Sequence, residues 1–233
     1  MPTASYQERR SQVEAYFGGA AAQNWSRLTS EAPVGRIRAT VRAGREQMRL
    51  QLLSWLPDDL RGARLLDAGC GTGVLAVELA RRGGKVLAVD LSPALIGLAR
   101  QRAPHELGAN RVEFRVGDML DEAFGNFDFV IAMDSLIHYT TRDVVHALSA
   151  LAARTADAML FTFAPSTPAL VVMHAIGRCF PRRNRAPAIE PVGERLIRRL
   201  LAAEHELRRW RVSRSGRIAS GFYTSQALEL IPA

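Results

Sequence analysis

The chain has 233 residues, a length that suits one compact domain with modest additions and leaves little room for a second full domain. Hydrophobic residues make up 48% and charged residues 23%, which predicts a globular protein with a sizeable core and excludes a disordered chain. The formal net charge is +8, and Lys85 is the only lysine, so arginine carries nearly all of the positive charge. Two interpretations stay open: these arginines are solvated, or some of them meet carboxylates, lipid head groups or phosphates.

The first residues and the apolar runs indicate the compartment. Residues 1–10 lack the apolar core of a signal peptide, so we expect a cytoplasmic protein. The longest nearly apolar run, at 168–177, is shorter than the roughly 20 residues that cross a bilayer, although it suits peripheral contact with a membrane. Cys70 and Cys179 are the only cysteines, which argues against a disulfide framework and a zinc site, and we expect no metal.

The first 57 residues contain two segments with apolar residues at helical spacing. A short apolar face comes first, formed by Val13, Tyr16 and Phe17. A longer one follows, formed by Ile37, Val41, Met48 and Leu52. We therefore expect an N-terminal helical arm over 1–57, ahead of a second unit over 58–233.

From Arg64 onward, short apolar runs alternate with helical segments, the pattern of parallel βαβ units. The expected strands are 64–68, 85–89, 112–116, 127–132 and 157–163. The expected helices are 73–82, 93–102 and 141–154. The order predicts an α/β fold built on a Rossmann-like, mostly parallel sheet.

The tail adds two further β runs, 205–213 and 218–226. Arg214, Ser215 and Gly216 separate them, so we expect an antiparallel hairpin with its turn at these residues. With the hairpin the sheet has seven strands.

Residues 164–191 do not fit this alternation. They begin with Ala164 and Pro165, continue through an apolar run, and end in a basic tip that contains Arg182, Arg183 and Arg185. Ligands bind at the carboxyl ends of the strands in sheets of this kind, and the segment directly follows the fifth strand. We expect it to be a lid over that edge.

A glycine-rich turn follows the first predicted strand, where residues 65–73 read LLDAGCGTG. Gly69, Gly71 and Gly73 let the backbone turn sharply and approach a ligand closely. A dinucleotide-binding fingerprint spaces its glycines by two and then three, whereas these are spaced by two and two. Asp67, at the strand end, suits the cationic amino group of a methionine moiety and would repel a pyrophosphate.

Carboxylates also end the next two predicted strands. Asp90, 17 residues after Gly73, can accept hydrogen bonds from both ribose hydroxyls. Asp118 can receive an adenine amino group, and Met119 can cover the ring face. Each aspartate alone also suits a turn or a helix cap. At consecutive strand ends they predict a site for a nucleoside linked to methionine.

Residues 64–163 resemble the class I S-adenosylmethionine-dependent methyltransferases in these motifs. A closer likeness lies in FDFVIAMDSLIHY at 127–139, VEAYF at 13–17, and SGFY at 220–223. The steps Ala164-Pro165 and Phe180-Pro181 of the insertion fit as well. In these segments the chain resembles the magnesium protoporphyrin IX O-methyltransferase family of bacteriochlorophyll synthesis, over nearly its whole length.

The resemblance implies that S-adenosyl-L-methionine is the methyl donor and that a propionate of magnesium protoporphyrin IX is the acceptor. It also implies two candidate partners, a magnesium chelatase subunit that delivers the porphyrin and the inner or photosynthetic membrane. The residues expected to bind the cofactor are Asp67, Gly69, Cys70, Gly71, Gly73, Asp90, Leu91, Asp118, Met119, Met133 and Arg45.

His138 lies just past the fourth strand, where the acceptor should sit. A propionic acid has a pKa of about 4.3 and is already an anion at neutral pH, so a strong base is not required. We expect His138 to be the catalytic residue, which orients the propionate or removes a stray proton. The alternative is a loop histidine that caps a helix or packs on Tyr139. The expected substrate contacts are Tyr139, Arg182, Arg183 and Arg185.

Other arm residues are less distinctive. Either Arg42 or Arg45 can pair the cofactor carboxylate, with solvated helix charges as the alternative. A tyrosine of the family arm is also a catalytic candidate, but counting from Trp25 places Thr29 at its position in this sequence. Tyr16 suits a cofactor contact or the core.

Three rival functions stay open. In the first, the methyl acceptor is a quinone precursor or another small molecule. In the second, the acceptor is a nucleic acid. In the third, the protein is a non-catalytic scaffold that binds the cofactor. The net charge of +8 gives nucleic acid some weight. However, Asp134, Ser135 and Leu136 lack the Asn/Asp-Pro-Pro-aromatic pattern of amino-methylating nucleic-acid enzymes, so we expect no nucleic-acid partner.

Overall fold

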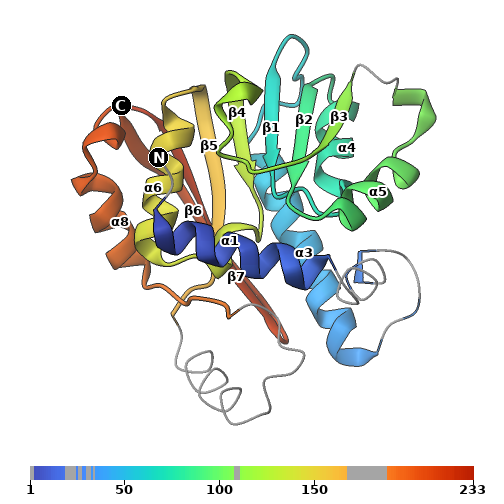
Figure 1. Cartoon of the computed structure of the whole chain (residues 1–233), viewed down its shortest axis with the longest axis horizontal. Coiled ribbons are helices and arrows are strands. Elements are labelled where there is room, and N and C mark those ends of the chain that lie inside the picture. The colour runs from blue at the N-terminus through green and yellow to red at the C-terminus, as the bar shows by residue number, and fades with distance from the viewer. Residues whose placement is uncertain are drawn as a thin grey trace.

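A computed structural model of the chain describes residues 3–18, 25, 28–29, 33, 35–107, 111–166 and 188–233. These residues form one seven-stranded sheet with helices on both of its faces (Figure 1). Among them no helix is long and apolar enough to cross a membrane.

The sheet has the strand order β3-β2-β1-β4-β5-β7-β6. Its strands are β1 Arg64–Ala68, β2 Lys85–Asp90, β3 Val112–Val116, β4 Phe127–Ala132, β5 Thr155–Phe163, β6 Trp210–Ser220 and β7 Tyr223–Pro232. The first five run parallel, and β7 pairs with β5 and β6 in the antiparallel direction. The predicted fold, a mostly parallel Rossmann-like sheet that ends in an antiparallel hairpin, is confirmed.

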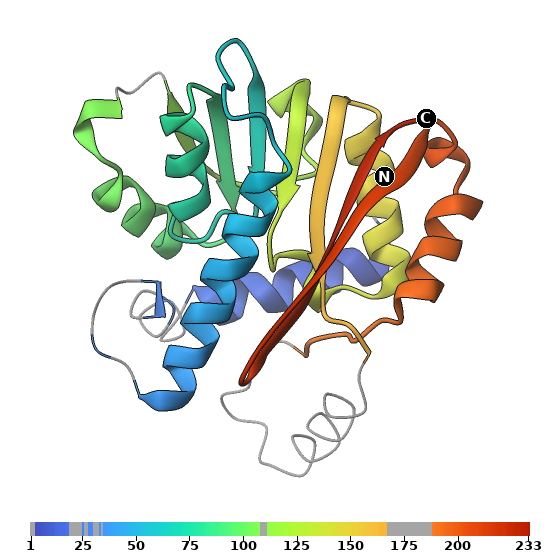
Figure 2. The ribbon, with the colours of Figure 1, turned by 180° about the vertical axis from the view of Figure 1, so that it is seen from behind.

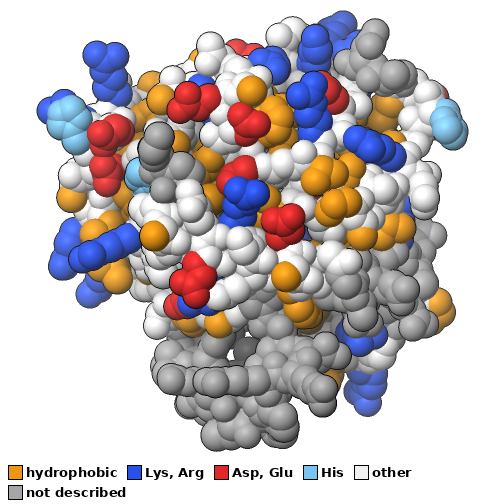
Figure 3. All heavy atoms as spheres, viewed as in Figure 1, with side chains coloured by type: hydrophobic (Ala, Val, Ile, Leu, Met, Phe, Trp, Pro, Cys, Tyr) orange, Lys and Arg blue, Asp and Glu red, His pale blue; other side chains and the backbone are white. Residues whose placement is uncertain are grey.

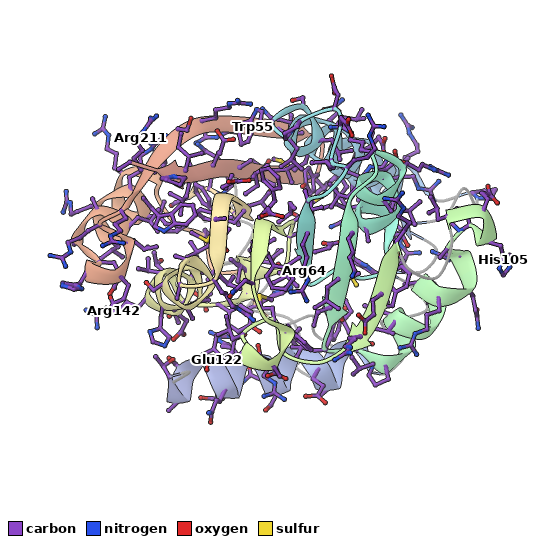
Figure 4. The ribbon with its side chains drawn as sticks, turned by 90° about the horizontal axis from the view of Figure 1, so that it is seen from above. Trp55, Arg64, His105, Glu122, Arg142 and Arg211 are labelled. Carbon is purple, nitrogen blue, oxygen red and sulfur yellow. The ribbon has the colours of Figure 1, made fainter. Side chains whose placement is uncertain are left out.

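The helices divide between two apolar cores, one on each face of the sheet. The helices are α1 Ala4–Phe17, α3 Arg36–Ser54, α4 Val74–Arg81, α5 Pro93–Arg102, α6 Thr141–Ala152 and α8 Glu194–Ala203. Helices α3, α4 and α5 contribute to one core, and α6 and α8, with Tyr6 of α1, contribute to the other. Figure 4 looks along the strands and places α1 and Trp55, which follows α3, on opposite sides of the sheet. Short 3₁₀ helices are His105–Leu107, Glu122–Phe124, Leu136–His138 and His205–Leu207.

Local sequence sets the starts of several helices. The Ser92 hydroxyl accepts a hydrogen bond from the Leu95 N–H, and Pro93 occupies the first position of α5, where its missing N–H costs nothing. The Thr140 hydroxyl caps α6 in the same way. Such caps satisfy backbone N–H groups that have no partner within the helix. They place the starts of these helices beside the carboxyl ends of the strands.

Helix α1 lies across those strand ends, as Figure 1 shows in dark blue. At its start, the hydroxyls of Thr3 and Ser5 donate to Asp143 of α6, at 2.5 and 2.7 Å. At its end, the Ser92 hydroxyl donates to the Phe17 carbonyl oxygen at 2.8 Å. Both ends of α1 are therefore fixed to the sheet-bearing part of the chain, so this helix of the arm closes over the ligand-binding edge.

The turn predicted at 214–216 is wrong. Ser215 pairs with Leu228 and Gly216 with Ala227, so both lie within β6, whose register shifts between Val212 and Ser215. The hairpin turns instead at Gly221, where φ is +56°. The glycine at 216 allows α3 to pack closely on β6, because a Cβ there would lie 1.9 Å from the Gln51 side chain of α3.

Helix α3 packs against this hairpin, which Figure 2 shows from behind the sheet. Gly44 permits the close approach: a Cβ at this position would lie 2.4 Å from Cδ1 of Tyr223 on β7. The tip of the hairpin also contacts α3, since a Cβ at Gly221 would lie 2.5 Å from the Thr40 hydroxyl oxygen. Helix α3 is thus fixed to the sheet by positions that tolerate no added side chain.

Two glycine-to-alanine substitutions test this packing. Gly44→Ala should lower the free energy of unfolding by about 1–3 kcal/mol, because the added methyl overlaps the Tyr223 ring. Gly97→Ala is the matched control, since a Cβ there meets nothing within 4 Å. It should raise stability by about 0.5–1 kcal/mol through helix propensity. Urea denaturation of both variants measures the difference, and equal effects would contradict the packing.

Candidate active site

A cavity of about 900 Å³ opens at the carboxyl ends of β1 to β4. Its wall combines residues of these strand ends with residues of α1 and α3 and with Trp25, Leu28 and Thr29. Twelve of the predicted site residues line it: Asp67, Gly69, Cys70, Gly71, Asp90, Leu91, Asp118, Met119, Met133, Arg45, His138 and Tyr139.

The glycine-rich turn forms the floor of the cavity. The N–H groups of Gly69 and Cys70 both donate to the Val89 carbonyl oxygen, at 2.8 and 2.9 Å. Gly69 has a φ of +82°, and a Cβ there would lie 2.3 Å from Cβ of Ser135. The turn therefore brings bare backbone close to the space that a ligand would fill.

Gly73 has a structural role at the start of α4. It is not among the residues that line the cavity, and it caps α4 with a φ of +78°. A Cβ at this position would lie 2.6 Å from the Phe114 ring. Gly73 thus lets α4 start close to β3, and its assignment to cofactor binding stays a prediction.

Asp67 is a buried carboxylate with an unused acceptor. It is 2% exposed, and its Oδ2 atom has no hydrogen-bond partner among the described residues. Burial, and next the nearby charge of Asp90, raise the pKa of Asp67 to about 7, against the opposing effect of the Ala76 N–H. A cationic donor at Oδ2 would relieve the cost of burying this charge. Burial likewise raises the pKa of the Cys70 thiol, which disfavours a reactive thiolate.

Two backbone N–H groups already donate hydrogen bonds to the carboxylate of Asp90. Its Oδ2 accepts from the Gly71 N–H and its Oδ1 from the Ser92 N–H, both at 2.9 Å. Burial raises the pKa of Asp90, while these two N–H groups lower it. Each oxygen keeps one lone pair, so Asp90 can still accept from the two hydroxyls of a ribose.

Asp118 is held by residues from two segments. Its Oδ1 accepts from the Tyr6 hydroxyl at 2.8 Å and from the Leu120 N–H at 3.0 Å. Its Oδ2 lies 3.6 Å from a guanidinium nitrogen of Arg10. Tyr6 and Arg10 were not predicted as site residues, because nothing in their local sequence separates them from the other residues of a mostly polar helix.

Asp134, just past β4, lines the cavity and was likewise not predicted from the sequence as part of the site. Its carboxylate accepts from Arg45 at 2.5 Å, from Tyr223 at 3.1 Å, and from Ser225 and Thr162 at 3.2 Å. It is also the only described non-glycine residue with a positive φ, +53°. This network joins α3 to β5 and β7 at the cavity wall.

The arm arginines are already partnered. Arg45 pairs with Asp134, and its guanidinium carbon lies 4.4 Å from the centroid of the Trp25 ring. Arg42 donates through Nε to the Leu28 carbonyl oxygen at 3.1 Å. Both line the cavity, so the pairing of either with a cofactor carboxylate stays a prediction.

His138 ends a 3₁₀ helix that follows β4 and lines the cavity. Its Nδ1 lies 3.4 Å from the Ala188 carbonyl oxygen, and its ring centroid lies 6.5 Å from that of Phe17. Tyr139 is buried, and its ring stacks on Tyr6 with centroids 4.7 Å apart. The structure brings both residues to the cavity without deciding their predicted roles.

The two ends of the predicted lid meet beside His138. The Val192 N–H donates to Ala164 and the Ser166 N–H donates to Val192, both at 2.9 Å. Glu190 donates through its N–H to the carbonyl oxygen of Ile137 at 2.8 Å. The insertion therefore returns to the residues where it starts, and Ile189 near its end lines the cavity. The basic tip, Arg182, Arg183 and Arg185, lies outside the described residues.

Thr29 and Tyr16 also line the cavity. The Thr29 hydroxyl donates to the Trp25 carbonyl oxygen at 2.9 Å and accepts from Arg102 at 3.1 Å. Tyr16 makes an edge contact with Phe17. The Thr29 hydroxyl thus bonds within the arm and to α5, and its match to the family tyrosine stays a prediction.

These residues can hold a molecule that combines an ammonium, a ribose and a base. The unpartnered oxygen of Asp67 suits the ammonium, the free lone pairs of Asp90 suit the ribose, and Asp118 suits an amino group on the base. Gly69 and Gly71 give such a molecule access to the backbone. The donor set therefore fits S-adenosylmethionine, as the sequence predicted.

The buried Asp67 carboxylate predicts how stability depends on pH. The pKa of about 7 lies above the ordinary value of 3.8, so ionisation opposes folding. Without ligand, the contribution of Asp67 to the free energy of unfolding should be fully present below pH 3.8, where the carboxyl is protonated in both the folded and the unfolded chain. The free energy of unfolding should then fall by a few kcal/mol as pH rises through about 7, the pKa in the folded protein. Asp67→Asn should remove that fall in urea denaturation series at pH 5 to 8. A wild-type fall that persists unchanged in the variant would contradict the assignment.

Comparisons with known proteins agree with this geometry. Residues 59–160 match a family model described as a methyltransferase domain, and residues 132–232 match one described as the magnesium-protoporphyrin IX methyltransferase C-terminus. The chain is 46% identical over 233 residues to the magnesium-protoporphyrin O-methyltransferase of Rhodobacter capsulatus, with all of both chains covered.

Solved structures give the same result. The magnesium protoporphyrin IX methyltransferase of Synechocystis PCC 6803 with bound SAH has a TM-score of 0.84 and 30% identity, over 97% of this chain and 100% of that one. Its structure with bound SAM has a TM-score of 0.79 and 27% identity, over 97% of each chain. The chain therefore belongs to the magnesium-protoporphyrin O-methyltransferase family.

Proposed function

We propose that this chain transfers the methyl group of S-adenosylmethionine to a propionate carboxylate of magnesium protoporphyrin IX, a step of (bacterio)chlorophyll synthesis. The observation that carries the proposal is the strand-end cavity, in which a buried Asp67 oxygen without a partner stands beside the carboxylates of Asp90 and Asp118. Membership of the family supplies the acceptor.

Three carboxylates hold the methyl donor in this proposal. Asp67 accepts from its ammonium group, Asp90 accepts from the ribose hydroxyls, and Asp118 accepts from the adenine amino group. Met119, which is buried and lines the cavity, covers the base. When bound, S-adenosylmethionine supplies an electrophilic methyl group on a sulfonium ion.

The protein contributes mainly position and shelter from water. The propionate is already an anion, so its oxygen can attack the methyl group directly once the two are aligned. Carboxylate and sulfonium lose their charges together, and a site that excludes water favours this neutralisation. Phe17 and Tyr16 of α1 form part of the wall of the cavity, so α1 limits the access of water.

His138 orients the acceptor. The residue is 8% exposed, belongs to the segment that directly follows β4, and lines the cavity. A ring N–H that donates to one propionate oxygen leaves the other oxygen to attack. We assign Tyr139 and the lid arginines Arg182, Arg183 and Arg185 to the remaining substrate contacts, on the basis of their place in the sequence.

Two further partners follow from the substrate. A flat macrocycle with little polar surface favours direct delivery, so we assign a magnesium chelatase subunit as the donor of the porphyrin. Exposed arginines such as Arg142 and Arg211 project outward in Figure 4 and suit peripheral contact with an anionic membrane. On the face in Figure 3, however, side chains of both charges are interspersed, which favours solvated arginines there.

Turnover of the purified protein tests the proposal. Incubation with the methyl donor and magnesium protoporphyrin IX should yield the monomethyl ester, identified by its mass, and one equivalent of S-adenosylhomocysteine. A dihydroxy quinone precursor in place of the porphyrin is the matched control for the rival class of acceptors. Methylation of the quinone precursor and not of the porphyrin would overturn the proposed substrate. Cofactor binding without turnover on either would favour the scaffold.

Substitution of His138 separates its two roles. His138→Phe should lower turnover and leave the affinity for S-adenosylhomocysteine nearly unchanged, because the side chain acts on the acceptor. An orienting role predicts a modest loss that does not depend on pH, whereas a base predicts a wild-type rate that falls as the pH drops and the imidazole is protonated. His105→Phe, a change at an exposed residue that does not line the cavity, is the control. Full activity of His138→Phe would exclude both roles.

A further inference from the structure

Tyr6 is the most deeply buried aromatic side chain of the arm. It is 1% exposed, although it belongs to a helix on which it is the only buried residue. Its ring stacks on Tyr139 with centroids 4.7 Å apart and planes 20° apart. Its hydroxyl donates to Oδ1 of Asp118 at 2.8 Å. Tyr6 of the arm thus lines the strand-end cavity and donates a hydrogen bond to the carboxylate of Asp118.

This hydrogen bond decides which oxygen of Asp118 is available to a ligand. Oδ1 receives two donors, the Tyr6 hydroxyl and the Leu120 N–H, which use both of its lone pairs. Oδ2 has only the guanidinium of Arg10, at 3.6 Å and with the Arg10 side chain 40% exposed. Oδ2 is therefore the oxygen that can accept an N–H from a ligand.

The surroundings of Tyr6 keep its hydroxyl in place as a donor. Burial, and then the charges of Tyr139 and Asp118, raise the pKa of Tyr6, so the hydroxyl keeps its proton at any physiological pH. The start of its helix is tied to Asp143 by Thr3 and Ser5. The position of the hydroxyl is thus fixed by hydrogen bonds to α6 and by the stack on Tyr139.

We propose that Tyr6 is a positioning residue that makes the base subsite selective for a 6-amino purine, by fixing Asp118 with Oδ2 presented as an acceptor. The proposal rests on the cofactor assigned above and deepens it. An adenine amino group donates to this oxygen. A 6-oxo purine presents a carbonyl oxygen there, which would face a carboxylate with no donor between them.

Binding of two ligands to three proteins tests the proposal. The ligands are S-adenosylhomocysteine and its inosine counterpart, which differ in the 6-amino group, and calorimetry gives both affinities. The wild type should prefer the adenine ligand by about tenfold or more. Tyr6→Phe keeps the ring and removes the donor, and should reduce that preference by about three- to tenfold through weaker adenine binding. Ser11→Ala removes an exposed hydroxyl from the same helix, one that bonds only to the Gln7 carbonyl oxygen, and should keep the wild-type preference.

A double substitution separates positioning from general structure. Asp118→Asn should abolish most of the preference, and adding Tyr6→Phe to it should change the preference no further, because Tyr6 acts through Asp118. Equal loss of both ligands in Tyr6→Phe, or an unchanged preference, would overturn the role of Tyr6 and leave the proposed function intact. A wild type that binds neither ligand would overturn the proposed function and this inference together.

Discussion

The buried carboxylate of Asp67 sets the strongest physical requirement in this structure. It lies at the end of β1 with one oxygen that no described residue satisfies, near a second carboxylate, that of Asp90. Two acidic groups in a site of low polarity oppose folding unless a cation joins them. The protein meets part of this cost through the N–H groups around Asp90. The ammonium of the proposed ligand would supply what remains, at a site that lowers stability when it is empty.

The rest of the architecture serves that edge of the sheet. Parallel strands bring their carboxyl ends together, and each of the first three ends in or near an aspartate that lines the same cavity. The arm then contributes from outside the sheet: α1 reaches Asp118 through Tyr6, and α3 reaches Asp134 through Arg45. The ligand-binding role proposed for Asp118 would thus couple ligand binding to the seating of α1.

Local patterns were enough to predict the sheet, its helices and the aspartates at the strand ends, because strand periodicity and the glycine turn are short-range signals. Tyr6 and Asp134 could not be predicted in this way, since their roles come from contacts with residues far along the chain. The predicted position of the hairpin turn was wrong for the same reason. A glycine is needed at 216 because the Gln51 side chain of α3 packs against it, and not because the backbone turns there. The lid over 164–191 stays a prediction, although Ile189 near its end lines the cavity.

The assignment of Asp67 to the ammonium group of the methyl donor is tested most directly by comparing the affinities of two ligands. Calorimetry would compare S-adenosylhomocysteine with an analogue in which hydrogen replaces the amino group of the methionine portion. The account predicts that the analogue binds about 10- to 100-fold more weakly, as expected for a buried charge-assisted hydrogen bond, and that Asp67→Asn narrows the difference. Equal affinity of the wild type for both ligands would contradict it.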